Sequence, residues 1–172
     1  MVDLRPLRPA LLICVLVAGC GNPLPGTLLG TYQVTATVGD NTCGLGAPSV
    51  RQFDVELSET TTATAQTLYW SWLDHTPIAS GPLATLQATL TSSQSGNVDG
   101  TDAGPGPCTM DRADSLVVTL GAGTPPGSFG GTMSYAFSAA SGADCSDQLS
   151  AAGGAYAALP CTVTYALAAT RR

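Results

Sequence analysis

Apolar residues recur at every second position in seven stretches of this chain of 172 residues, and an eighth candidate strand is a short run over residues 78–84. In the first stretch, Tyr32, Val34, Ala36 and Val38 alternate with Gln33, Thr35 and Thr37. A period of two residues is typical of β-strands that bury one face, and it conflicts with the 3.6-residue period of a helix. The strands expected from this pattern cover residues 32–38, 52–58, 68–72, 78–84, 86–91, 116–120, 133–138 and 162–167.

Turn-forming clusters such as Gly39-Asp40-Asn41 and Ser95-Gly96-Asn97 separate most of these stretches. Sequential strands with short connections favour an antiparallel up-and-down meander, and closing that meander into a barrel removes its exposed edges. The sequence therefore predicts an all-β fold, an eight-stranded antiparallel up-and-down barrel, with a two-sheet β-sandwich as the alternative. One short helix is expected within residues 147–158, with Ser146 as its cap.

Lipocalins and avidins have this barrel architecture. Gly30-Thr31-Tyr32, at the start of the first expected strand, is similar to the Gly-x-Trp sequence at which their first strand begins. The resemblance concerns architecture, and no function is carried over from it. An eight-stranded interior is either filled by side chains or holds one small ligand.

The N-terminal residues have the features of an export signal. Arg5 and Arg8 precede an unbroken apolar run over residues 10–17, which is too short to span a membrane but suits a signal peptide. The run ends in Val17-Ala18-Gly19-Cys20, which resembles the lipobox of bacterial lipoproteins. The resemblance implies cleavage before Cys20 and attachment of a diacylglycerol to its thiol. The alternative is an ordinary secretory signal that a cysteine follows by chance.

The lipobox divides the chain into a signal peptide (1–19), a lipidated tether (20–29) and a single β domain (30–172). Gly21 follows the lipidated cysteine, and in the enterobacterial sorting pattern a residue other than Asp there directs a lipoprotein to the outer membrane. The chain thus resembles the small outer-membrane lipoproteins of Gram-negative bacteria. We expect it in the cell envelope, held to the membrane by its N-terminal lipid.

Four further cysteines, Cys43, Cys108, Cys145 and Cys161, remain in the β domain. An even number in an exported chain predicts two disulfides. In an eight-strand meander all four fall at one end of the barrel, and Leu28 and Thr170 fall at the other. We favour the pairs Cys145–Cys161 and Cys43–Cys108. Because the first and last strands are neighbours in a closed barrel, Cys43–Cys161 with Cys108–Cys145 is the rival arrangement.

The composition argues against several classes of function. A net charge of −6 without a basic patch argues against nucleic-acid binding. His75 is the only histidine, so a multi-histidine metal centre is impossible, and no Gly-x-Ser-x-Gly sequence accompanies it. We therefore expect no catalytic residue, no metal and no cofactor. Arg112 is flanked by Asp111 and Asp114, and we expect them to form a surface ion pair.

Five aromatic residues lie on the apolar faces of the expected strands: Trp70, Trp72, Tyr135, Phe137 and Tyr165. They either fill the core or line a ligand pocket. The first functional hypothesis is a non-enzymatic binding or interaction module displayed on the envelope, with a protein partner. The alternative is a carrier of a small apolar ligand in the barrel interior. A cavity beside these aromatic residues favours the carrier, and a filled core with an apolar patch at the cysteine end favours the interaction module.

Overall fold

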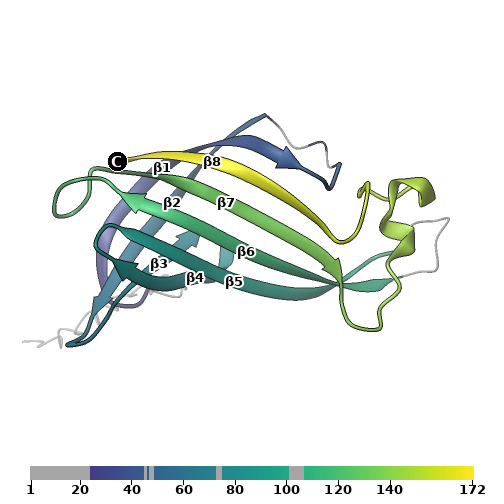
Figure 1. Cartoon of the computed structure of the whole chain (residues 1–172), viewed down its shortest axis with the longest axis horizontal. Coiled ribbons are helices and arrows are strands. Elements are labelled where there is room, and N and C mark those ends of the chain that lie inside the picture. The colour runs from purple at the N-terminus through teal and green to yellow at the C-terminus, as the bar shows by residue number, and fades with distance from the viewer. Residues whose placement is uncertain (1–23, 45, 47–48, 73–74, 101–106) are drawn as a thin grey trace, which may run out of the picture.

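The computed structural model describes residues 24–44, 46, 49–72, 75–100 and 107–172, which form a closed β-barrel (Figure 1). Each strand pairs antiparallel with the next strand in the chain, and β1 also pairs with β8. The predicted eight-stranded up-and-down barrel is confirmed, and the alternative two-sheet sandwich is wrong. The strands are β1 (Thr27–Asn41), β2 (Val50–Thr61), β3 (Gln66–Trp72), β4 (His75–Ala84), β5 (Gln87–Val98), β6 (Cys108–Leu120), β7 (Ser128–Ala139) and β8 (Cys161–Arg171).

The alternating apolar residues point into the barrel and form one large core, which we call the barrel core. Its largest fully buried members are Trp70, Tyr32, Leu57, Leu68, Leu90 and Leu116. At the end where β1 begins, the Tyr32 ring packs on Phe129 with 5.3 Å between ring centroids. The Tyr32 hydroxyl donates a hydrogen bond to the carbonyl of Pro126 at 2.8 Å. This end, which we call the tether end, is therefore closed by side chains.

A second, smaller core lies at the other end of the barrel, under the connection between β7 and β8. The inward residues Cys108 and Met110 of β6 pack there with Cys145, against the partly buried Tyr156 and Leu159 of the connection. The connection contains two short 3₁₀ turns, η1 (Ser146–Gln148) and η2 (Ser150–Ala152), and it lies at the end of the molecule opposite the C-terminus (Figure 1). These two turns stand where one short helix within residues 147–158 was expected, and Ser146 is not its cap, because no side-chain cap bond is formed at η1.

Hydrogen bonds join the β7–β8 connection to two neighbouring connections. The amide of Ala157 donates to the carbonyl of Cys43 at 2.7 Å, after the end of β1. The side-chain amide of Gln148 donates to the carbonyl of Asp99 at 2.8 Å, after the end of β5. The connection therefore reaches both the β1 side and the β5 side of this end.

Both disulfides lie at this same end, which we call the disulfide end. They join Cys43 to Cys161 and Cys108 to Cys145. The favoured pairing is wrong and the rival pairing is right, because barrel closure makes β1 and β8 neighbours and brings Cys43 beside Cys161. The opposite placement of Leu28 and Thr170 is confirmed by the register, in which Leu28 faces Ser58 and Thr170 faces Ser128.

The expected signal peptide (1–19) and Cys20, the residue expected to carry lipid, lie outside the described residues. β1 begins at Thr27, inside the segment expected to be tether. Within the part of the chain that the structure describes, no helix is long and apolar enough to cross a membrane.

Candidate ligand-binding site

Four inward-pointing aromatic side chains toward the disulfide end are only partly buried: Phe53, Trp72, Tyr135 and Phe137. Each shares a strand face with residues of the barrel core, so each points into the barrel. By contrast, Trp70, deeper along the same face of β3 as Trp72, is 0% exposed. Burial is therefore complete toward the tether end and incomplete at these four residues, which we call the barrel mouth.

The aromatic rings of the mouth pack on two buried rings nearer the tether end, which we call the floor. Phe53 and Trp72 contact each other with ring centroids 4.4 Å apart, and Trp72 meets the buried Trp70 edge-on at 5.9 Å. On the opposite wall Tyr135 meets the buried Tyr165 edge-on at 6.0 Å. The five aromatic residues singled out in the sequence thus divide into floor (Trp70, Tyr165) and mouth (Trp72, Tyr135, Phe137). Whether they contact a ligand stays a prediction.

A charged pair lies on the inner wall beside the mouth. The Arg112 guanidinium donates from Nε to one carboxylate oxygen of Asp114 and from a terminal nitrogen to the other, both at 2.6 Å. Ser92 on β5 also donates to this carboxylate at 3.3 Å. Asp114 is 5% exposed and the Arg112 side chain 34%. The expectation of a surface pair is therefore wrong, because both side chains lie on the inward face of β6.

Strand alternation explains why this pair was misplaced. Met110, Arg112, Asp114 and Leu116 occupy every second position of β6, so they share the face that lines the interior. Charged residues at two of these positions interrupt the apolar period, and the expected strand began only at residue 116. The signal that could have found the pair is the register itself, since the inward face continues through Met110 to Cys108.

The Arg112 guanidinium also lies over the ring of Tyr135, 4.3 Å from its centroid. Burial raises the pKa of Tyr135 far above its ordinary value of 10.0, and the nearby charges of Arg112 and Arg51 only partly oppose this shift. The phenol therefore stays protonated and can donate a hydrogen bond. Burial lowers the pKa of Arg112, but its hydrogen bond and charge interaction with Asp114 outweigh that effect and raise it overall.

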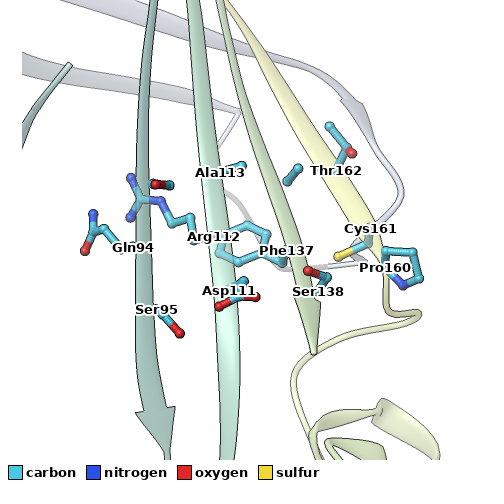
Figure 2. A pocket seen from close by; sticks show the side chains of 12 residues that line it. Gln94, Ser95, Asp111, Arg112, Ala113, Phe137, Ser138, Pro160, Cys161 and Thr162 are labelled. Carbon is cyan, nitrogen blue, oxygen red and sulfur yellow. The ribbon is translucent and has the colours of Figure 1, made fainter. Parts of the chain in front are cut away.

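A shallow groove of about 530 Å³ crosses β5 to β8 near the same level (Figure 2). Most of its lining belongs to the outward face of these strands, where side chains such as Ser93, Ala113 and Ala136 are small. In Figure 2 the side chains of Gln94 and Arg112, from paired positions of β5 and β6, lie at one side of this groove. Short methyl and hydroxyl side chains offer a ligand few contacts, so the groove is a weaker candidate site than the mouth.

No apolar patch marks the disulfide end among the described residues. The large exposed apolar side chains are scattered: Leu28 and Leu86 lie at the tether end, Val117 on the outer wall, and Val50 at the start of β2. Searched over the same residues, no three His, Cys, Asp or Glu side chains form a group that could hold a metal ion. The barrel mouth is thus the best-supported site.

No protein-family model, no curated protein and no solved structure matches this chain. Its function has to be inferred from the mouth, the Arg112–Asp114 pair and the sequence of the N-terminal segment.

Proposed function

We propose that this protein is a membrane-anchored, non-enzymatic binding protein of the bacterial cell envelope, and that its barrel mouth holds a small, largely apolar ligand. The observation that carries this proposal is the partial exposure of Phe53, Trp72, Tyr135 and Phe137, all of which point inward. The exposed part of these aromatic rings gains about 25 cal/mol for each Å² that a ligand covers. A concave aromatic surface with a few polar groups is the usual form of a small-molecule site.

The orientation of the barrel supports this function. The proposed lipid on Cys20 precedes β1, and β1 begins at the closed tether end. The mouth lies toward the opposite end, beside the β7–β8 connection, so in this orientation it faces away from the membrane. Two disulfides suit a protein that works in an oxidising compartment such as the periplasm or the cell surface.

A second candidate is the display of the disulfide end to a protein partner. The observation that favours it is the fixing of the β7–β8 connection by Cys108–Cys145 and by hydrogen bonds to the carbonyls of Cys43 and Asp99. A surface held in this way loses little conformational entropy when it binds. The scattered apolar side chains give this candidate less support than the mouth gives to a small ligand.

The test uses the uncharged fluorescent probe phenylnaphthylamine and the lipid-free mature protein. Trp72→Ala removes one wall of the mouth, and Val117→Ala, on the outer wall, is the matched control. We expect saturable binding at one site, weakened at least about tenfold by Trp72→Ala, since burying one large ring is worth about 1.5–3 kcal/mol. Val117→Ala should leave it unchanged. Absence of saturable binding, or equal binding by the two variants, would refute the proposed site.

A further inference from the structure

The inward-facing charged side chains near the barrel mouth sum to a net positive charge. Three charged side chains belong to the inward faces of β2 and β6 near the mouth: Arg51, Arg112 and Asp114. The two oxygens of Asp114 are both occupied by Arg112, so this pair is neutral as a unit. Arg51 is exposed, and no ion pair to it occurs among the residues that the structure describes. These inward strand positions therefore carry a net charge of about +1, in a chain whose total charge is −6.

The register of β1 and β2 places Arg51 on the inner face. Arg51 lies opposite Ala36 and Phe53 lies opposite Val34, and both β1 residues are fully buried inside the barrel. Directly opposed residues on antiparallel strands share a face, so Arg51 and Phe53 both project inward. The charge of Arg51 also acts on the hydroxyl of Tyr135 across the interior. Arg51 thus lies one inward-facing position nearer the disulfide end than the ring pair of Phe53 and Trp72.

Unused hydrogen-bond donors face the same space. Arg112 donates to Asp114 through Nε and one terminal nitrogen, and its other terminal nitrogen has no partner among the described residues. The hydroxyl of Tyr135 stays protonated, and none of the hydrogen bonds between described residues involves it. Donors that no described residue of the protein accepts from are complementary to an anionic group, which offers acceptors alone.

We infer that the ligand is a small anionic amphiphile, whose single carboxylate, sulfonate or phosphate group pairs with Arg51 at the mouth and whose aromatic or aliphatic body covers Phe53 and Trp72. This inference rests on the proposed function and adds the chemical class of the ligand. The Arg112–Asp114 pair, already neutral, supplies a donor without adding net charge. A cationic amphiphile is disfavoured, because Arg51 repels it and Asp114 is screened by Arg112.

The experiment compares two probes that differ by one charged group. Anilinonaphthalene sulfonate carries the anionic group, and phenylnaphthylamine is the same ring system without it. The variants are Arg51→Gln and, as a control that removes the same charge at the tether end, Arg172→Gln. Circular dichroism and the melting temperature confirm that each variant is folded, and titration to saturation confirms one site.

We expect the sulfonate to bind the wild type about tenfold more tightly than the uncharged probe, since one charge-assisted contact is worth about 1.4 kcal/mol. Arg51→Gln should abolish that difference and leave the uncharged probe within about twofold. Arg172→Gln should leave both affinities unchanged. Equal binding of the two probes, or equal effects of the two variants, overturns the anionic ligand while the proposed function stands. If neither probe binds at one site, the proposed function fails and this inference falls with it.

Discussion

The guanidinium of Arg112 lies 2.6 Å from the carboxylate of Asp114 and 4.3 Å from the centroid of the Tyr135 ring, inside the barrel. This contact stands where the barrel core ends and the smaller core under the β7–β8 connection begins. A buried carboxylate is tolerated there because Arg112 and Ser92 satisfy its oxygens. The arginine is kept in one orientation by an ion pair on one side and an aromatic face on the other.

The two members of this pair should contribute unequally to stability. Arg112→Met leaves the nearly inaccessible carboxylate of Asp114 without its cation, and we expect a loss of about 3 kcal/mol in the free energy of unfolding. Asp114→Leu leaves Arg112, which is one-third exposed and can turn to water, so the loss should be smaller. The double variant should recover much of the loss of Arg112→Met, because no buried charge remains. Urea unfolding at neutral pH measures all three, and equal losses in the two single variants would contradict the asymmetry.

Alkaline pH should weaken the fold through its buried phenols. Burial raises the pKa of Tyr135 in the folded protein, so the folded state keeps a proton that the unfolded chain releases near pH 10.0. The stabilisation is complete below that pH and is lost as the pH rises above it. Tyr135→Phe keeps the ring under Arg112 but removes the titrating group. We expect its free energy of unfolding to fall less than that of the wild type between about pH 9 and about pH 11. Parallel curves would show that Tyr135 does not carry the effect.

The sequence predicts the barrel well because its strongest signal, the two-residue period, is a direct consequence of strands with one buried face. The period locates Tyr32, Val34 and Trp70 inside. The two-residue period does not reveal the first half of β6 or the mouth, because Arg112 and Asp114 occupy inward positions but are not apolar. Their burial depends on each other and on Ser92 of another strand, and such a long-range arrangement leaves no local signal.

The pairing of the four cysteines is the other feature that the sequence does not determine. The strand directions place all four cysteines at one end, which leaves three pairings open. The choice depends on closure: in a barrel β1 and β8 become neighbours, and the start of β6 meets the β7–β8 connection. Neither relationship is local in the sequence, so the favoured pairing was wrong even though the strand order was right.

The two disulfides should differ in their contribution to stability. Cys43–Cys161 closes a loop of 118 residues and Cys108–Cys145 one of 37. The loop-entropy relation gives about 5 and about 4 kcal/mol for these lengths. The pair of variants Cys43→Ser/Cys161→Ser and Cys108→Ser/Cys145→Ser should rank in that order in denaturant unfolding. Peptide mapping without reduction checks the connectivity independently, and a peptide linking Cys43 to Cys108 would contradict it.

Membrane attachment should depend on one of the two N-terminal cysteines, Cys20, and not on the other, Cys14. Cys20→Ser removes the thiol that the lipobox resemblance marks for acylation, so we expect an unprocessed precursor or a protein released from the membrane. Cys14→Ser, within the apolar run, is the matched control and should be processed and anchored as the wild type is. Membrane fractionation with mass spectrometry of the mature chain distinguishes the two. A processed Cys20→Ser chain of mature length that stays with the membrane would refute the lipobox assignment.

The tether end should rest against the membrane surface. Only six residues lie between Cys20 and Thr27, a reach of at most about 25 Å over the seven steps of chain. The turns at this end, residues 62–65, 85–86 and 121–127, contain no charged residue, and β8 ends there at Arg171, followed by Arg172.

Because these turns are uncharged, little desolvation free energy opposes their close approach to lipid. Each arginine near anionic headgroups stabilises that approach by about 1 kcal/mol. The measurement attaches an environment-sensitive fluorophore at Ala122→Cys in the β6–β7 turn, or at Ala151→Cys in η2 as the control at the disulfide end. With the lipidated protein in anionic vesicles, nitroxide-labelled headgroups should quench the first fluorophore strongly and the second weakly. Stronger quenching at residue 151 would place the mouth toward the membrane, and a ligand would then have to enter from the bilayer.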